Sequence, residues 1–232
     1  GFALRWIGEP MLPCHASPIM YLHQPMTRYA VIDFETSGLS PLMGDRALEI
    51  AAVIVENGEV RESWQSLMNP GIPVPAFITQ LTGITQAMVR DAPPPKQVMA
   101  EVAEFVGGAT LVAHNASFDK KFWEHELDRI RIRQRPSFLC TLLIARRLYP
   151  WADNHRLQTL VELHNIKPEG EYHRALADAT VTAHLFMQMK KDLAALQALL
   201  DKTKSERDKL ANDYAAADKN LKTLQSSYSA LE

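Results

Sequence analysis

The sequence has too few cysteines for a disulfide framework and no hydrophobic run long enough to cross a membrane. Among its 232 residues are only two cysteines, Cys14 and Cys140, which also cannot form a four-cysteine zinc site. No window approaches the roughly 18 consecutive apolar residues of a membrane-spanning helix. No basic segment followed by an apolar run marks a secretory signal at the N-terminus. We therefore expect a protein of a reducing compartment, the cytoplasm, without a membrane partner.

The sequence also lacks an excess of charge of either sign. The 25 Lys and Arg residues nearly balance 27 Asp and Glu residues, for a net charge of −2. A uniformly basic coat for sequence-independent binding of nucleic acid is therefore not expected. Hydrophobic residues make up 47% and charged residues 22% of the chain, which excludes wholesale disorder. The length suits one domain of about 150–200 residues with additional segments.

Three segments differ in their pattern. Residues 1–28 contain four prolines and no persistent period, which predicts an irregular arm, and Met26 is one candidate for the natural start of the chain. Residues 29–190 alternate between strand and helix patterns, and residues 191–232 are helical throughout. Strands are predicted over 29–33, 47–55, 60–67, 110–113 and 137–140, and helices over 76–90, 95–106, 117–128, 141–148, 156–164 and from 174 onward. This order predicts an α/β domain with a mixed sheet flanked by helices.

The last predicted helix carries a heptad pattern beyond the domain. Apolar residues recur at alternating steps of four and three from Met189 to Leu231, interrupted only at Thr203 and Arg207, and no Gly or Pro follows Gly170. This pattern predicts a C-terminal coiled-coil helix over 191–232. Its apolar stripe should be covered by a second copy of the chain or by another protein. The alternative is a long helix that folds back on its own domain.

Two carboxylates lie close together at the end of the first predicted strand. Asp33 and Glu35 are two residues apart, so in a strand they point to the same face. Neighbouring carboxylates repel each other unless a cation lies between them. Mg²⁺ and Mn²⁺ prefer oxygen ligands. The pair therefore indicates a metal site, although one of the two could be an ordinary surface residue.

Two further acidic residues follow later elements. Asp119 comes after the fourth strand, where open α/β sheets place their ligand sites. Alternatively, Asp119 only complements the dipole of a helix that Ser117 caps. His173 and Asp178 lie at the start of the last helix. Each of these residues alone has an ordinary structural explanation, but their joint occurrence in this order does not.

Taken together, these motifs resemble the DEDDh type of DnaQ-like 3′→5′ exonucleases, which includes replicative proofreading subunits and RNase T. That family has Asp-x-Glu after the first strand, His-Asn-x-x-Phe-Asp before a helix, and His-x4-Asp at the final helix. The corresponding residues here are Asp33 with Glu35, His114 through Asp119, and His173 with Asp178. The resemblance covers about residues 29–190 and implies an RNase H-like fold.

The resemblance also implies a two-metal mechanism with Mg²⁺ or Mn²⁺. Asp33 would bridge both ions. Glu35 and Asp178 would complete one ion, and Asp119 would hold the other. Two cations about 3.5–4 Å apart stabilise the attacking and leaving oxygens of a phosphodiester. His173 would be the general base, since imidazole titrates near neutral pH.

Substrate contacts are expected around these carboxylates. By resemblance, Phe34 and Thr36 would contact the terminal nucleotide, and Leu39 would wedge against its base. His114 and Asn115 would lie beside the scissile phosphate, with a structural hydrogen bond as the alternative role of His114. Alternating arginines over 129–135 could also track a phosphate backbone, or form an ordinary solvated loop.

We therefore expect a metal-dependent 3′→5′ exonuclease that releases nucleoside monophosphates from single-stranded DNA 3′ ends. Trimming of RNA 3′ ends is the alternative, because the same motifs serve both. A scaffold that keeps the fold and assembles partners through its tail is a third hypothesis. The sequence ends in heptad register, which favours a nuclease module that the coiled coil joins to a larger assembly.

Overall fold

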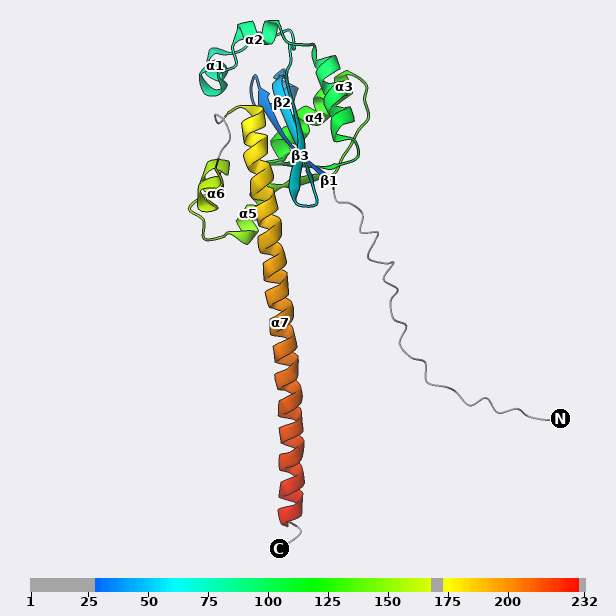
Figure 1. The fold of residues 1–232 in the computed structure, drawn as a ribbon, viewed down its shortest axis with the longest axis vertical. Helices are drawn as coiled ribbons and strands as arrows, with labels where there is room; N and C mark the ends of the chain where they lie inside the picture. The colour runs from blue at the N-terminus through cyan, green and yellow to red at the C-terminus, as the bar shows by residue number, and fades with distance from the viewer. Residues whose placement is uncertain (1–27, 168–172, 230–232) are drawn as a thin grey trace, which may run out of the picture.

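A five-stranded mixed sheet organises the domain (Figure 1). The structure is a computed structural model that describes residues 28–167 and 173–229. The sheet has the order β3-β2-β1-β4-β5, with β1 antiparallel to β2, β2 antiparallel to β3, β4 parallel to β1 and β5 parallel to β4. The strands are β1 Arg28–Thr36, β2 Ala47–Glu56, β3 Glu59–Leu67, β4 Thr110–Ala113 and β5 Phe138–Cys140. The predicted mixed α/β sheet is confirmed.

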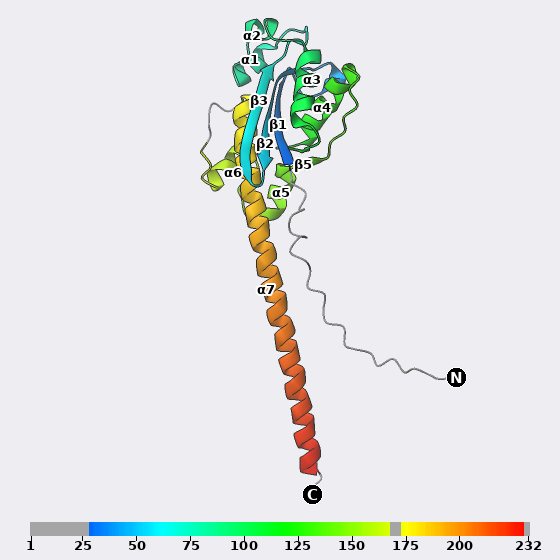
Figure 2. The same cartoon turned by 45° about the vertical axis from the view of Figure 1, so that its right-hand side comes forward.

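Helices cover both faces of the sheet (Figures 1 and 2). They are α1 Ala76–Thr82, α2 Gln86–Arg90, α3 Pro95–Val106, α4 Ser117–Arg129, α5 Thr141–Leu148, α6 Leu157–Leu163 and α7 Ala175–Ser229, with a short 3-10 helix, η2, at Pro41–Met43. Residues 1–27 of the expected irregular arm lie outside the described residues. Arg28, which the sequence analysis assigned to the arm, instead opens β1.

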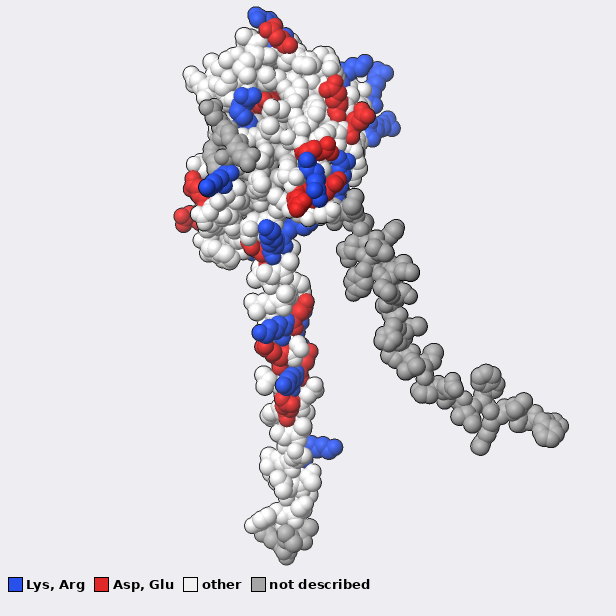
Figure 3. Space-filling view, in the orientation of Figure 1, with Lys and Arg blue, Asp and Glu red and all other residues white. Residues whose placement is uncertain are grey.

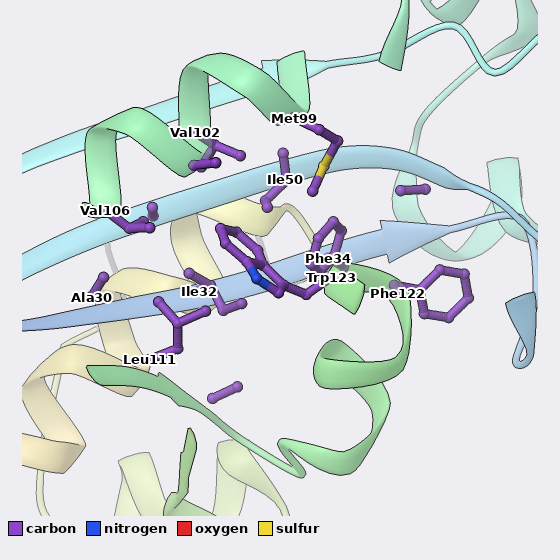
Figure 4. Close-up of a cluster of buried hydrophobic side chains, with 14 of the residues drawn as sticks. Ala30, Ile32, Phe34, Ile50, Met99, Val102, Val106, Leu111, Phe122 and Trp123 are labelled. Carbon is purple, nitrogen blue, oxygen red and sulfur yellow. The ribbon is translucent and has the colours of Figure 1, made fainter. Parts of the chain in front are cut away.

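The two-residue period of β1 sends alternate side chains into different layers. Ala30, Ile32 and Phe34 pack into the cluster formed with α3 and α4 (Figure 4). Val31 packs into the cluster formed with α7 on the opposite face. Asp33 and Glu35 follow Val31 at two-residue steps along the strand, so their side chains face the same layer, the one that contains α7.

The segment predicted as one helix over 76–90 is two short helices. Gly83 ends α1 in the left-handed conformation, with φ of 72°, which glycine adopts without steric penalty. Thr85 then caps α2, because its side chain accepts a hydrogen bond from the amide of Met88 at 3.3 Å. The regular spacing of apolar residues did not reveal this break, although Gly83 was its local signal.

Two buried glutamates join segments that are far apart in the sequence. Glu126 of α4 accepts hydrogen bonds from Nε and Nη2 of Arg46 at 2.7 and 2.8 Å. Glu49 of β2 accepts from Nη2 of Arg174 at 2.7 Å and from the amide of Ala175 at 3.1 Å. The second pair fixes the first turn of α7 against the sheet.

Helix α7 leaves the domain after its fourth turn. It is 55 residues long, and its last buried residue is Met189. Asp192, one turn further on, still accepts a hydrogen bond from the hydroxyl of Tyr149 at 2.6 Å. The rest of the helix then projects away from the domain (Figures 1 and 2). Within the described ranges, no helix combines the length and apolar character needed to cross a bilayer.

The Arg46–Glu126 pair should be a major contributor to stability. We expect Glu126→Ala to lower the free energy of unfolding by about 3–5 kcal/mol, because it leaves a largely buried guanidinium without its carboxylate. Urea unfolding of the purified variant would measure this. As a control on the same helix, Glu124→Ala removes a partly exposed ion pair with Lys120 and should cost less than about 1 kcal/mol. Equal losses in the two variants would contradict the assignment.

Candidate active site

The site lies where β1 ends beside the first turn of α7. Asp33 and Glu35 stand on one face of β1, and their side chains line a cavity of about 290 Å³. The same cavity is lined by Asp119, His173 and Asp178. All five residues expected to be catalytic thus meet in one place, although they come from β1, the start of α4, and the start of α7.

Burial and mutual repulsion disfavour the ionised forms of the β1 carboxylates. Burial raises the pKa of Asp33 well above its usual value, and the charges of Asp119 and Glu35 raise it further. Burial, followed by the charge of Asp178, raises the pKa of Glu35 to about 8, although Arg174 opposes this shift. Ionising both carboxyl groups is therefore costly, and the charge of Arg174 offsets this cost only in part.

Asp119 connects α4 to β1. It lies in the first turn of α4 and is buried. Its Oδ1 atom accepts a hydrogen bond from the amide of Phe34 at 3.2 Å, while burial raises its pKa to about 7. The expected cap by Ser117 is wrong, because α4 begins at Ser117 itself and Ala116 takes the cap position without a side-chain hydrogen bond.

His173 and Asp178 form a compact unit before and inside the first turns of α7. The backbone of His173 is left-handed, with φ of 64°, and its amide donates to Oδ2 of Asp178 at 3.1 Å. The other carboxylate oxygen of Asp178, Oδ1, is buried and has no hydrogen-bond partner among the described residues. Possible ligand atoms of Glu35, His173 and Asp178 all lie within 4.8 Å of one another.

These residues fit divalent cations. The cavity gathers four carboxylates, and burial raises the pKa of each of them, with like charges adding to the shift for Asp33 and Glu35. Asp178, which also lines the cavity, keeps one buried carboxylate oxygen without a hydrogen-bond partner among the described residues. Oxygen-rich, negatively charged sites of this kind suit Mg²⁺ and Mn²⁺. A bound cation would favour the ionised carboxylates and relieve their repulsion.

The expected substrate residues all line this cavity, in different ways. The ring of Phe34 is buried and packs in the α3–α4 cluster, which leaves its backbone to face the site. Thr36 is buried and donates to the carbonyl of Gly38 at 2.6 Å. Leu39 is 82% exposed at the rim.

The loop after β4 contributes two neighbours of different character. Both ring nitrogens of His114 have partners, Thr141 Oγ1 at 2.9 Å and the carbonyl oxygen of His155 at 3.0 Å, so its structural role is well defined. Asn115 is exposed and left-handed, with φ of 63°. Its position leaves the side-chain amide accessible at the mouth of the cavity.

Two features of the site escaped sequence analysis. Phe77 and Leu81 of α1 are 61% and 53% exposed and line the same cavity as the acidic residues. Their i, i+4 spacing places them on one face of the helix, which is the only local signal. The Glu49–Arg174 pair is the second feature, and its partners are too far apart in sequence to be matched by pattern.

A larger cavity adjoins the site. It measures about 680 Å³ and shares His114 and Asn115 with the acidic cavity. Its walls carry Arg146 and Arg156, and neither guanidinium has a hydrogen bond or ion pair with any described residue. Arg156 also lines a smaller cavity with His173 and Asp178. The acidic cavity therefore adjoins a second cavity that is lined by basic side chains.

The alternating arginines over 129–135 lie elsewhere. Gln134 within this loop donates to the carbonyls of Ala103 and Gly107, and the adjoining Ser137 accepts from the amide of Leu111 at the start of β4. The loop therefore lies at the N-terminal ends of β4 and β5. The acidic site lies at the other end of these strands, where the parallel strand β1 ends. Arg131 and Arg133 are exposed there.

Comparison with known sequences supports one family. Residues 30–186 match the family model described as Exonuclease, of the RNase T type. The chain is 39% identical over 178 residues to the PolC-type DNA polymerase III of Caldanaerobacter subterraneus subsp. tengcongensis, a match that covers 77% of this chain and 12% of that protein. It is 39% identical over 171 residues to the 3′-5′ exonuclease DinG of Bacillus subtilis, covering 73% and 18%. It therefore spans less than a fifth of the length of these relatives.

Solved structures agree on the fold. Exonuclease X in complex with 5′ overhanging duplex DNA is 31% identical, with a TM-score of 0.56 over 70% of this chain and 91% of that chain. The nuclease domain of 3′hExo, a DEDDh family member bound to rAMP, is 21% identical, with a TM-score of 0.64 over 73% and 94%. The expected RNase H-like exonuclease fold is confirmed.

The raised pKa values predict that the metal-free protein loses stability as pH rises. Glu35 and Asp119 have pKa values of about 8 and 7 in the fold, above their ordinary values. Their contribution to stability is therefore complete at acidic pH and is lost as pH rises through this range. In EDTA, the Tm should fall between about pH 5.5 and 8.5 more steeply for the wild type than for Glu35→Gln.

Excess Mg²⁺ should flatten this fall, because a bound cation favours the ionised carboxylates. Glu59→Gln, at an exposed position on β3, is the matched control and should behave as the wild type. Calorimetry or a thermal shift assay would measure both effects. A wild-type Tm in EDTA that rises over this pH range relative to Glu35→Gln would overturn the assignment.

Proposed function

The chain belongs to the RNase T and DnaQ-like exonuclease family, and on that basis we propose that it is a metal-dependent 3′→5′ exonuclease acting on single-stranded DNA. The observation that carries this proposal is the convergence of Asp33, Glu35, Asp119 and Asp178 on one cavity together with His173. A scaffold without catalysis would not need four carboxylates held together against their mutual repulsion.

The carboxylates would hold two divalent cations, Mg²⁺ or Mn²⁺. Asp33 lies centrally, since Asp119, Glu35 and Asp178 all raise its pKa by their charge. This position suits a ligand shared by both ions. Glu35 and Asp178 would complete one ion, and Asp119 the other. When bound, the ions would supply stabilisation of the charge that develops on the attacking and leaving oxygens.

His173 would remove the proton from the attacking water. Its side chain is exposed beside the acidic cavity, while its amide is tied to Asp178 at 3.1 Å. The ring can therefore reach solvent and substrate while the backbone keeps it in place. Its proximity to Glu35 and Asp178 would also allow metal ligation, so the two roles need separate measurements.

The walls of the site suggest how the nucleic acid lies. Leu39, Phe77 and Leu81 form an exposed apolar rim on one side, suited to the base of the 3′-terminal nucleotide. Arg146 and Arg156 lie on the other side, without ion-pair partners in the described chain. Phosphates of the preceding nucleotides would be attracted there. Phe34 and Thr36 would contact the terminal nucleotide, and Asn115, next to His114, the phosphate.

DNA is the favoured substrate. The relatives at 39% identity are a PolC-type DNA polymerase III and the exonuclease DinG, and the structure at 31% identity contains duplex DNA. RNA is the second candidate, because the 3′-exonuclease fold recurs at 21% identity in a structure named for histone mRNA recognition. Degradation of matched end-labelled DNA and RNA oligonucleotides, side by side with Mg²⁺ or Mn²⁺, would separate the two.

We also propose that the chain divides into an exonuclease domain, residues 29–190, and a coiled-coil tail, residues 191–232, that joins it to a second copy. The segment before Arg28, which itself opens β1, would be an arm outside the domain. The cytoplasm remains a prediction from the small number of cysteines. A larger assembly with another protein is the alternative for the tail, and the molar mass of the purified chain in solution distinguishes these states.

Removing a carboxylate should abolish turnover without unfolding the domain. We expect Asp33→Ala and Asp119→Ala each to reduce cleavage of a single-stranded DNA 3′ end by more than about 10³-fold, because transition-state stabilisation of several kcal/mol is lost. Stability in EDTA should be unchanged or higher, because one repelling charge is gone. The release of nucleoside monophosphates, followed by chromatography, is the measurement.

Glu59→Gln, remote from the cavity, should retain full activity. Excess EDTA should stop the wild-type enzyme. Near-normal cleavage by either alanine variant, or by the wild type in excess EDTA, would remove the metal-dependent mechanism.

His173→Ala should lower kcat by about 10²–10⁴-fold, the contribution expected of a general base. Its affinity for Mn²⁺, measured by titration calorimetry, should stay close to the wild-type value, because His173 is not proposed as a ligand. Asp178→Ala provides the comparison and should lose metal affinity. Equal loss of affinity in both variants would make His173 a ligand instead.

A further inference from the structure

The heptad positions of α7 are buried within the domain and exposed beyond it. Within the domain, the heptad positions Ala175, Ala179, Thr182, Phe186 and Met189 are all at most 3% exposed. The same steps of four and three continue beyond the domain, but there the apolar residues are 47–76% exposed: Leu193, Leu196, Leu200, Leu210, Tyr214, Leu221, Leu224 and Tyr228. An isolated helix with such a stripe lacks the burial that normally stabilises it.

The position of the domain restricts what can cover this stripe. Up to Met189 the heptad side of α7 faces its own sheet and helices. A partner helix lying along the exposed stripe must therefore end where the domain begins. In a parallel pair, both domains would occupy the space between the two helices at the same end. Figures 1 and 2 show that the tail leaves the domain from one end of the chain. In an antiparallel pair, each domain would lie beside the far end of the partner's tail.

We infer that the tail forms an antiparallel two-stranded coiled coil with a second copy of this chain, in the register that places Arg207 opposite Ala217 of the partner subunit. In an antiparallel coiled coil, each a position faces a d position. This register satisfies that rule throughout. The layers are Arg207 with Ala217 of the partner subunit, Leu210 with Tyr214 of the partner subunit, Thr203 with Leu221 of the partner subunit, Leu200 with Leu224 of the partner subunit, and Leu196 with Tyr228 of the partner subunit.

Four of these five layers match a larger side chain with a smaller one, and the fifth pairs two leucines. Ala217 leaves room for the long side chain of Arg207, whose guanidinium can extend to solvent. Tyr214 and Tyr228 each meet a leucine rather than another tyrosine. Alternation of large and small residues across facing positions is how a helical interface fills evenly.

A parallel pair would place each residue against itself. Arg207 would then face the partner's Arg207, which brings two like charges and two long side chains together at one layer of the seam. Ala217 would face the partner's Ala217 and leave a void. The residues that interrupt the seam are therefore compatible with the antiparallel arrangement and unfavourable in the parallel one.

Charges beside the seam favour the same register. Lys204 and Asp218 occupy e positions, which face each other across an antiparallel interface, so each Lys204 lies opposite Asp218 of the partner subunit. In the single chain, Asp218 pairs within its own helix with Lys222 at 2.6 Å. One repulsive pair remains, Asp213 with the partner's Asp213 on the two-fold axis. Figure 3 shows how Lys, Arg, Asp and Glu flank uncharged surface along the tail.

The arrangement separates the two domains. At a rise of 1.5 Å per residue, the tail from 191 to 229 is about 57 Å long, so the domains would lie at opposite ends of a rod. If each is a nuclease, as proposed, the two sites would act on independent 3′ ends. The association itself does not depend on that activity, so a chain inactive on nucleic acid would leave it intact.

Disulfide trapping tests orientation and register. In full-length protein with Cys14→Ser and Cys140→Ser, one preparation carries Arg207→Cys and a second carries Ala217→Cys. Oxidation of the mixture should produce a covalent dimer, because these positions face each other at disulfide distance. Neither preparation alone should do so. Self-cross-linking of Arg207→Cys alone would show a parallel pair and overturn the proposal, as would a wild-type monomer at tens of micromolar in light scattering.

A charge reversal tests the same register without cysteines. Lys204→Glu introduces two repulsive pairs and should raise the dimer dissociation constant about fivefold to tenfold. Adding Asp218→Lys should restore it, which a general loss of helix stability would not. Lys209→Glu, on the same helix away from the seam, is the control and should leave it unchanged. Sedimentation equilibrium measures all three, and failure of the double variant to recover affinity would refute the register.

Discussion

Repulsion among carboxylates is the constraint on which this domain depends. Asp33 and Glu35 share one face of β1 with Asp119 and Asp178 nearby. Burial raises the pKa values of all four, and the opposing effects of Arg174 on Glu35 and of His173 on Asp178 offset this only in part. The fold holds them together through contacts outside the cluster. Among these are the Glu49–Arg174 pair and the hydrogen bond from the Phe34 amide to Asp119. The site thus stores an unfavourable charge distribution that divalent cations would relieve.

The surroundings of the cluster are asymmetric in a way that suits a polynucleotide end. Exposed apolar side chains of α1 line the acidic cavity, and the adjoining larger cavity is lined by Arg146 and Arg156. A nucleotide has an apolar base and an anionic phosphate, so these two walls provide separate environments for its two parts. The near-zero net charge of the chain conceals this division, because the acidic and basic regions compensate each other.

Helix α7 contributes to both the candidate site and the proposed dimer interface. Its first turns carry Asp178 into the site, its middle packs against the sheet, and its remainder projects with the same heptad stripe exposed. Because a helix is rigid over short distances, the direction in which the tail leaves is set by the packing that positions Asp178. In the proposed antiparallel pair, the domain that supplies the site also limits how far a partner helix can extend.

The sequence alone determined those features that depend on the spacing of residues along a strand or helix and on the chemistry of single side chains. The alternation along β1 placed Asp33 and Glu35 on one face, the motif set identified the family and its fold, and the heptad steps predicted a helix far longer than the domain. Local pattern misjudged the turn at Gly83 and the cap at Ser117. Only the tertiary structure decided that Arg174 meets Glu49, that Phe77 borders the cavity, and that Arg146 rather than the loop at 129–135 adjoins the site. Those relations join residues that the chain separates by tens of positions, and strand order and packing set them rather than any period in the sequence.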